Sequence, residues 1–179
     1  MHRFAPVALA AGILAMGTGL ALAAEYPAGD PVMVNGMEVG AVYLQPIEMD
    51  PPGMMKPAAA SDIHLEADIH AAKDNTNGFA EGDWIPDLSI AYSLEKDDGN
   101  FKASGDFMPM VASDGPHYGD NVKLAGQGKY KLILHISPPG MAGHFGRHVD
   151  KETGVAPWFQ PFDASYEFIY AGTGKKGSY

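Results

Sequence analysis

The sequence of 179 residues contains no cysteine. This absence excludes disulfide bonds, thiolate zinc sites and cysteine catalysis. It also excludes a blue-copper centre, because such a centre needs a cysteine thiolate. A transition metal would have to bind His, Met, Asp or Glu, and the chain supplies 7 His and 10 Met.

Positive charge is scarce. The chain has 12 Lys and Arg against 22 Asp and Glu, a formal net charge of −10. Because nucleic-acid binding depends on clustered Lys and Arg, we predict no nucleic-acid partner. The excess of carboxylates favours a cationic ligand or partner instead.

Long apolar runs are confined to the start of the chain. A basic start at Arg3 precedes an apolar stretch over residues 4–22, which ends in Ala21-Leu22-Ala23, the small-x-small form of a signal-peptidase site. We therefore predict that residues 1–24 are a cleaved secretory signal peptide and that residues 25–179 form one periplasmic domain. No later run could span a bilayer, so we expect no direct membrane anchoring.

The rest of the chain alternates polar and apolar residues with a period of two, which is typical of β-strands. The turn signal Asn35-Gly36 predicts a hairpin between residues 31–34 and 37–47. Further strands are expected at residues 61–72, 88–94, 101–111, 130–136 and 166–170. Several short strands without an amphipathic helix predict an all-β fold, most simply an immunoglobulin-like antiparallel β-sandwich.

Three segments depart from this alternation. Pro109 within residues 101–111 predicts an edge strand or a bulge. Residues 113–119 are expected to form a compact turn. Residues 137–157 show no clear element, and a loop of that length in a compact domain is usually functional or mobile.

Chemistry-bearing side chains gather on the segment from His64 to His70. If it is a strand, His64 and Glu66 share a face about 6.6 Å apart and could converge on one metal ion. His64 and His70, roughly 20 Å apart, cannot. The segment therefore offers two possible ligand pairs, one of which involves Asp68. The alternative is a charged, solvent-facing side of an antiparallel sheet.

A second group combines sulfur and imidazole. Met110 lies seven residues before His117, and Gly115-Pro116 could bend the chain so that both face one point. His148 adds a third imidazole on the long loop. A thioether with imidazoles favours copper, chiefly Cu(I), and a carboxylate admits Fe(II) or Mn(II). The alternatives are a methionine in the core and a histidine on the surface.

Five blocks together carry a resemblance to a known family. They are residues 42–49, 62–70, 108–119, 145–148 and 152–159. In this order they resemble the periplasmic high-affinity iron-transport proteins that accompany Ftr-type iron permeases and that include treponemal metal-binding lipoprotein relatives. The resemblance extends from about Tyr26 to Gly172. One departure is His144, where relatives usually have glycine.

The resemblance implies an immunoglobulin-like sandwich, a homodimer and a metal site near the dimer interface. That site would take copper and also iron or manganese, and its ligands are His64, Glu66, Met110, His117 and His148. It implies a non-enzymatic protein that supports ferrous iron uptake with an Ftr-type inner-membrane permease. The alternatives are a periplasmic copper-handling protein, a copper-dependent Fe(II) oxidoreductase and a β-sandwich adhesion module with incidental histidines.

Overall fold

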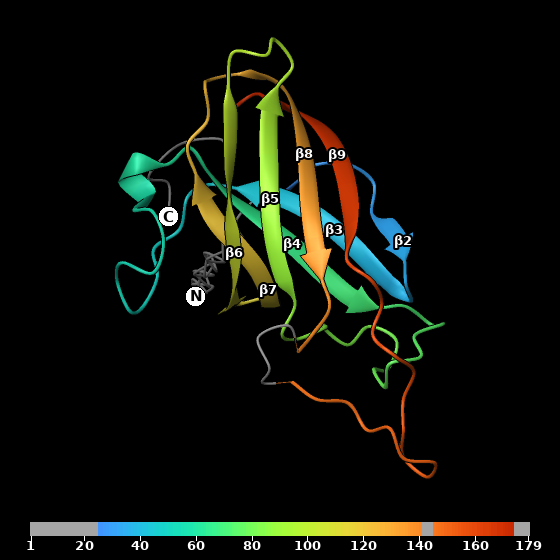
Figure 1. Ribbon diagram of the computed structural model, residues 1–179. Coiled ribbons are helices and arrows are strands. Elements are labelled where there is room, and N and C mark those ends of the chain that lie inside the picture. The colour runs from blue at the N-terminus through green and yellow to red at the C-terminus, as the bar shows by residue number, and fades with distance from the viewer. Residues whose placement is uncertain (1–24, 141–144, 174–179) are drawn as a thin grey trace, which may run out of the picture.

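The computed structural model describes residues 25–140 and 145–173, which form an antiparallel β-structure (Figure 1). The strands are β1 (Tyr26–Pro27), β2 (Val32–Val34), β3 (Met37–Leu44), β4 (Ile63–Ala71), β5 (Ser89–Lys96), β6 (Lys102–Ala112), β7 (Gly115–Val122), β8 (Gly128–Ser137) and β9 (Phe162–Tyr170). In this part of the chain the only helical element is a 3₁₀ turn, Ala58–Ala60. The prediction of an all-β fold is confirmed. The proposed signal peptide, residues 1–24, and His144 lie outside the described residues.

The strands follow one path, β1-β3-β4-β7-β6-β5-β8-β9, and β2 pairs with β3. Strand β6 joins two layers, because its first half, up to Phe107, pairs with β5 and its second half, from Met108, pairs with β7. Figure 1 shows β5 and β8 crossing in front of β3 and β4. The result is a nearly closed, barrel-like sheet, and the narrower immunoglobulin-like assignment stays a prediction. Over the described ranges, no helix is long and apolar enough to cross a membrane.

The core fills the space between the two layers. Leu65 and Ile69 from β4 are fully buried, as are Leu132 and Leu134 from β8. Tyr166 on β9 donates a hydrogen bond from its hydroxyl to the carbonyl oxygen of Val39 on β3, at 2.7 Å. This bond ties the last strand to the opposite layer, so the sheet that carries β4 is held against the rest of the core.

The predicted hairpin between β2 and β3 is confirmed. Val34 pairs with Met37, and the two residues between them, Asn35 and Gly36, have φ angles of 53° and 68°. Both lie in the left-handed region that a two-residue hairpin turn of this kind requires, and asparagine and glycine adopt it at the lowest cost.

Of two expectations about β6 and β7, one was wrong. Residues 113–119 are not a compact turn, because only Ser113 and Asp114 lie between the paired residues Ala112 and Gly115. The prediction of an edge position for Pro109 is confirmed locally, because β6 pairs with β5 only up to Phe107 and with β7 alone from Met108. Pro109 and Pro116 both lie where their strand has a single hydrogen-bonded neighbour, so neither missing N–H interrupts a two-sided ladder.

Candidate metal centre

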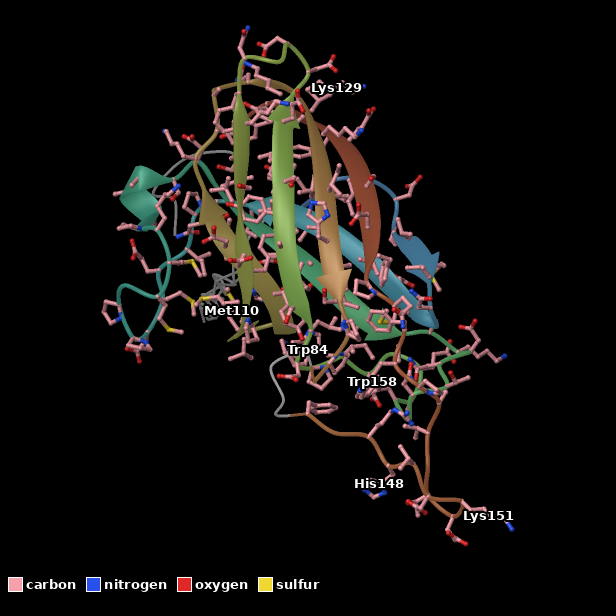
Figure 2. The ribbon with its side chains drawn as sticks, viewed as in Figure 1. Trp84, Met110, Lys129, His148, Lys151 and Trp158 are labelled. Atoms are coloured by element: carbon pink, nitrogen blue, oxygen red, sulfur yellow. The ribbon has the colours of Figure 1, made fainter. Side chains whose placement is uncertain are left out.

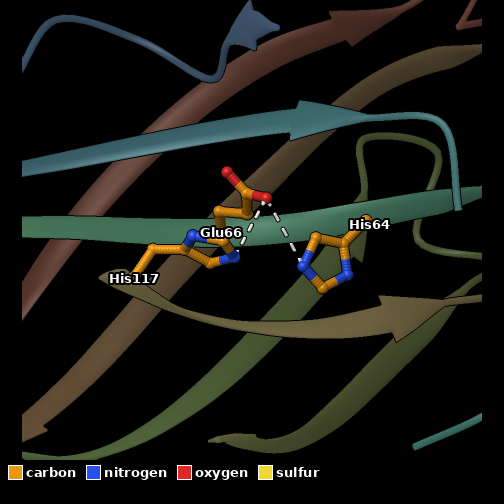
Figure 3. Close-up of side chains that lie close together, drawn as sticks. All are labelled: His64, Glu66 and His117. Carbon is orange, nitrogen blue, oxygen red and sulfur yellow. Dashed lines mark ion pairs between the residues drawn. The ribbon is translucent and has the colours of Figure 1, made fainter. Parts of the chain in front are cut away.

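Strands β4 and β7 bring His64, Glu66 and His117 together. The Oε1 atom of Glu66 lies 3.4 Å from Nε2 of His64 and 3.3 Å from Nε2 of His117 (Figure 3). One potential ligand atom from each residue lies within 4.8 Å of the others, and the exposed fractions of the three residues are 0%, 5% and 5%. The alternative of a solvent-facing charged side is therefore wrong for His64 and Glu66. Their role as metal ligands stays a prediction.

The register of the strands explains this convergence. His64 and Glu66 share a face of β4 because side chains alternate along a strand. Glu66 pairs with Gly119 on β7, so His117, two residues away on the same face, reaches the carboxyl group diagonally. On its other side His117 pairs directly with Met110 of β6.

Asn121 fixes the tautomer of His64. The amide nitrogen of Asn121 donates to the carbonyl oxygens of Ile47 and Lys56, both at 2.8 Å. Its Oδ1 atom must therefore be the acceptor for Nδ1 of His64, at 3.1 Å. Nδ1 carries the proton, and Nε2 of His64 presents its lone pair to the cluster.

Gly119 leaves room for the His64 imidazole. A Cβ atom at residue 119 would lie 2.6 Å from Nε2 and 2.9 Å from Cε1 of His64. Side chains do not approach so closely, so any larger residue would displace the ring from the cluster. Glycine at this position is a requirement of close packing.

Burial controls the charge of the cluster. It lowers the pKa of His64 to about 4, an effect that His117 reinforces. It raises the pKa of Glu66 to about 8, and the carboxylates of Asp68, Glu25 and Asp114 add to the shift. At neutral pH without a cation both groups are therefore uncharged, and their contact is not an ion pair. A bound cation would stabilise the ionised form of Glu66 and so release its proton.

Both histidines have an Nε2 atom with no hydrogen-bond partner among the described residues. Most buried side-chain nitrogens have a hydrogen-bond partner, and the lack of one costs about 1–3 kcal/mol of stability. Two such atoms that flank one carboxyl oxygen are typical of nitrogen donors arranged for a metal ion. The donor chemistry of the site thus fits a transition metal.

Met110 completes a wall of the adjoining cavity. The cavity has a volume of about 560 Å³, and its lining includes Glu66, Met110 and His117. Met110 is buried, and it faces the same side of the sheet as His117, its direct neighbour across the strand pair. The lining also includes Met49 and the acidic residues Glu25, Glu48 and Asp114, whose carboxyl groups favour a negative potential at the entrance.

His148 lies apart from the other predicted ligands. It belongs to the loop between β8 and β9, its side chain is 74% exposed, and its Nδ1 atom contacts the Oγ1 atom of Thr153 at 2.7 Å. Figure 2 shows His148 near the end of the extended loop, far from Met110. A single chain therefore brings together four of the five predicted residues.

Sequence reasoning missed Asn121 and Gly119. Both follow His117 at intervals of two, so the alternation along β7 could have placed all three on one face. That signal was hidden because Gly115-Pro116 suggested a turn. Sequence reasoning also missed Met49 and three acidic residues of the cavity, Glu25, Glu48 and Asp114, which come from separate segments with no common pattern.

Comparisons with known proteins identify the relatives of this chain. The model of the family described as "Fe2+ transport protein" matches residues 22–172. A UPF0423 protein of Brucella abortus (strain 2308) is 67% identical over 168 residues, which cover 93% of this chain and 92% of that protein.

Two copper-bound structures share the fold. One is a variant of FetP from uropathogenic Escherichia coli strain F11, with 60% identity and a TM-score of 0.81 over 83% of this chain and 99% of that chain. The other is copper-reconstituted P19 from Campylobacter jejuni, with 55% identity and a TM-score of 0.82 over 85% of this chain and 99% of that chain. The chain described here belongs to the Fe2+ transport protein family.

Proposed function

We propose that this protein binds copper through His64, Glu66, Met110 and His117 and supports the uptake of ferrous iron. The observation that carries the proposal is the pair of buried Nε2 atoms, 3.4 Å and 3.3 Å from one carboxyl oxygen and without hydrogen bonds. The copper-bound FetP and P19 structures support copper as the resident ion.

The donor set supports a second, harder ion as well. Met110 is soft and suits Cu(I), whereas Glu66 and the acidic cavity suit Fe(II) or Mn(II). We assign iron as the cargo because of the family to which the chain belongs. The partner in this role is an Ftr-type inner-membrane permease, and the site holds and presents the ion without catalytic turnover.

The place of action we propose is the periplasm, after removal of residues 1–24. FetP of uropathogenic Escherichia coli strain F11, which is 60% identical to this chain in its as-isolated form, was recombinantly expressed in that compartment. An apolar segment without acidic residues that ends in small residues supports export.

We also propose that the protein is a homodimer in which His148 of a second copy completes each site. Within one chain the exposed loop carries His148 away from the cluster, so a ligand role requires a second molecule. Trp158 and Phe159 on the same loop are only partly buried and could form an apolar contact. Sedimentation equilibrium with and without copper tests this point, and a monomer under both conditions would contradict it.

The function is tested by metal content and by growth. The protein purified from the periplasm should contain copper, and a deletion strain should grow poorly under iron limitation and recover when the gene is restored. A strain complemented with His117→Ala is expected to remain iron-limited. A deletion strain that grows normally under iron limitation but is sensitive to copper would instead identify a copper-handling protein. Multiple turnover of Fe(II) with oxygen by the purified protein would identify an oxidoreductase.

A further inference from the structure

A second hydrogen-bonded cluster lies on the outer face of the layer formed by β5, β8 and β9. Nδ1 of His135 lies 2.7 Å from Oδ1 of Asp163, and Nε2 of His135 lies 3.0 Å from Oγ of Ser93. The His135 side chain is 43% exposed, and the cluster is separate from the candidate metal centre. The proposed function does not use it.

The contacts fix the direction of both hydrogen bonds. A carboxylate can only accept, so Nδ1 of His135 donates to Asp163, and in the neutral imidazole Nε2 then accepts the hydroxyl proton of Ser93. This is the order of contacts by which a carboxylate orients an imidazole base and the base activates a hydroxyl nucleophile. Such an arrangement is recognised by geometry and not by the order of residues in the chain.

The strands hold the three side chains in place. His135 pairs directly with Asp163 across β8 and β9, and with Ala91 across β8 and β5. Ser93, two residues beyond Ala91, is therefore the diagonal neighbour of His135 on the same face. Regular strands on both sides restrict the side chains more than loops would.

Space for a small substrate lies beside the hydroxyl group. Ser93 lines a groove of about 450 Å³ together with Ser104, Lys131 and Ile133. The Lys102 ammonium in this groove is engaged by Glu95 at 3.1 Å. Lys131 adds positive charge to the lining of this groove, and such charge favours a developing oxyanion.

We propose that Ser93 is an acyl-accepting nucleophile that reacts with small activated esters. The Oγ atom of Ser93 bonds to the carbonyl carbon while its proton moves to Nε2 of His135. The bond from carbon to the leaving oxygen then breaks, and the alcohol product takes that proton. Water, deprotonated by the same nitrogen, then attacks the acyl carbon, the bond from that carbon to Oγ of Ser93 breaks, and the acyl group leaves as the carboxylic acid. The proton on Nε2 returns to Oγ and regenerates the hydroxyl group.

The test uses p-nitrophenyl acetate and the purified full-length mature protein, freed of metal by a chelator so that bound copper cannot hydrolyse the ester. Release of p-nitrophenolate gives the rate, and peptide mass spectrometry locates the acetyl group. We expect acetylation at Ser93 and its loss in Ser93→Ala. His135→Ala should slow acylation on the order of 100-fold, as expected when a general base is removed. Asp163→Asn should slow it as well, because the imidazole loses its orienting partner.

Ser165→Ala is the matched control. Ser165 is an exposed serine on the same outer face, two residues after Asp163 on β9, and it is not among the residues that line the groove. Its substitution should leave the rate unchanged, and circular dichroism should show that every variant remains folded. An acetyl group on His135 or on a lysine, or an unchanged rate in Ser93→Ala, would overturn the proposal.

Discussion

The Oδ1 atom of Asn121 lies 3.1 Å from Nδ1 of His64, and this contact determines which imidazole nitrogen faces the cluster. Asn121 can accept here only because its amide nitrogen is already bound to the carbonyl oxygens of Ile47 and Lys56. Asn121 is not itself a proposed ligand, but it thus determines which nitrogen of the proposed ligand His64 is the donor atom. Residues that hold a histidine in this way are often as important for metal affinity as the ligand.

Asn121→Ala is expected to weaken copper binding by about 10- to 100-fold. The alanine cannot accept the Nδ1 proton, so the imidazole of His64 loses both its fixed tautomer and its orientation. Competition titration against a Cu(I) chelator measures the effect. Asn77→Ala serves as the control, since Asn77 also donates from its side chain to two carbonyl oxygens, those of Ala156 and Pro157, but on another segment. Equal losses of affinity in both variants would show that Asn121 has no specific role in binding.

Gly119→Ala is expected to reduce copper affinity while the protein still folds. The added Cβ atom would lie 2.6 Å from Nε2 of His64, so the ring must move away from Glu66. Gly40→Ala is a matched control on β3, because its nearest contact would be an ordinary 3.5 Å from the carbonyl oxygen of Asp68. Copper titration and thermal unfolding of both variants distinguish a local effect from a general one. Unchanged affinity in Gly119→Ala would mean that the position of the ring does not limit binding.

Met110→Leu and Glu66→Gln should affect different ions. Met110→Leu removes the sulfur at nearly constant volume, so it should weaken Cu(I) binding much more than Mn(II) binding. Glu66→Gln removes a hard anionic oxygen and keeps the sulfur, so it should weaken Mn(II) binding more. Both ions are titrated against the wild-type protein and each variant. Because the expected effects are opposite, a general loss of folding cannot reproduce them, and equal weakening of both ions would contradict the division into soft and hard ligands.

The metal-free protein should lose stability as the pH rises because of Glu66. Its pKa is raised to about 8 by burial, above the ordinary 4.5, so the folded state binds the proton more tightly than the unfolded chain. The stabilising contribution is complete below pH 4.5 and is lost as the pH rises toward 8. His64, whose pKa is lowered to about 4, acts in the opposite sense and costs stability as the pH falls below 6.5.

Glu66→Gln removes only the first of these two contributions. The free energy of unfolding of the variant, relative to the wild-type protein, should therefore increase from pH 5 to pH 8, by on the order of 2–4 kcal/mol. Urea denaturation of chelator-treated protein at pH 5, 6.5 and 8 provides the measurement. Glu48→Gln, at an exposed carboxyl group in the same cavity, controls for the loss of a negative charge. A pH-independent difference between Glu66→Gln and the wild-type protein would contradict the burial argument.

The sequence by itself determined where most strands lie and which side chains share one face of a strand. A period of two placed His64 and Glu66 on one face of β4, and Asn35-Gly36 specified a hairpin, because both signals depend on neighbouring residues alone. The absence of cysteine limited the possible donors to those that the cluster contains. The family, which five blocks of the sequence had indicated by resemblance, was confirmed by the match over residues 22–172.

Only the tertiary structure decided which strands meet and which polar face is buried. The pairing of β4 with β7 places His117 beside Glu66, and the change of partner along β6 places Met110 opposite His117. The segment after β3 then covers the polar face of β4, since Ile47 and Lys56 bind Asn121 over His64. Strand order, strand register and the covering of the polar face depend on contacts between residues far apart in the chain. The local alternation of polar and apolar residues therefore cannot predict them. For the same reason the sequence could indicate His148 as a candidate ligand but could not predict the position of its loop, which lies away from the cluster in the folded chain.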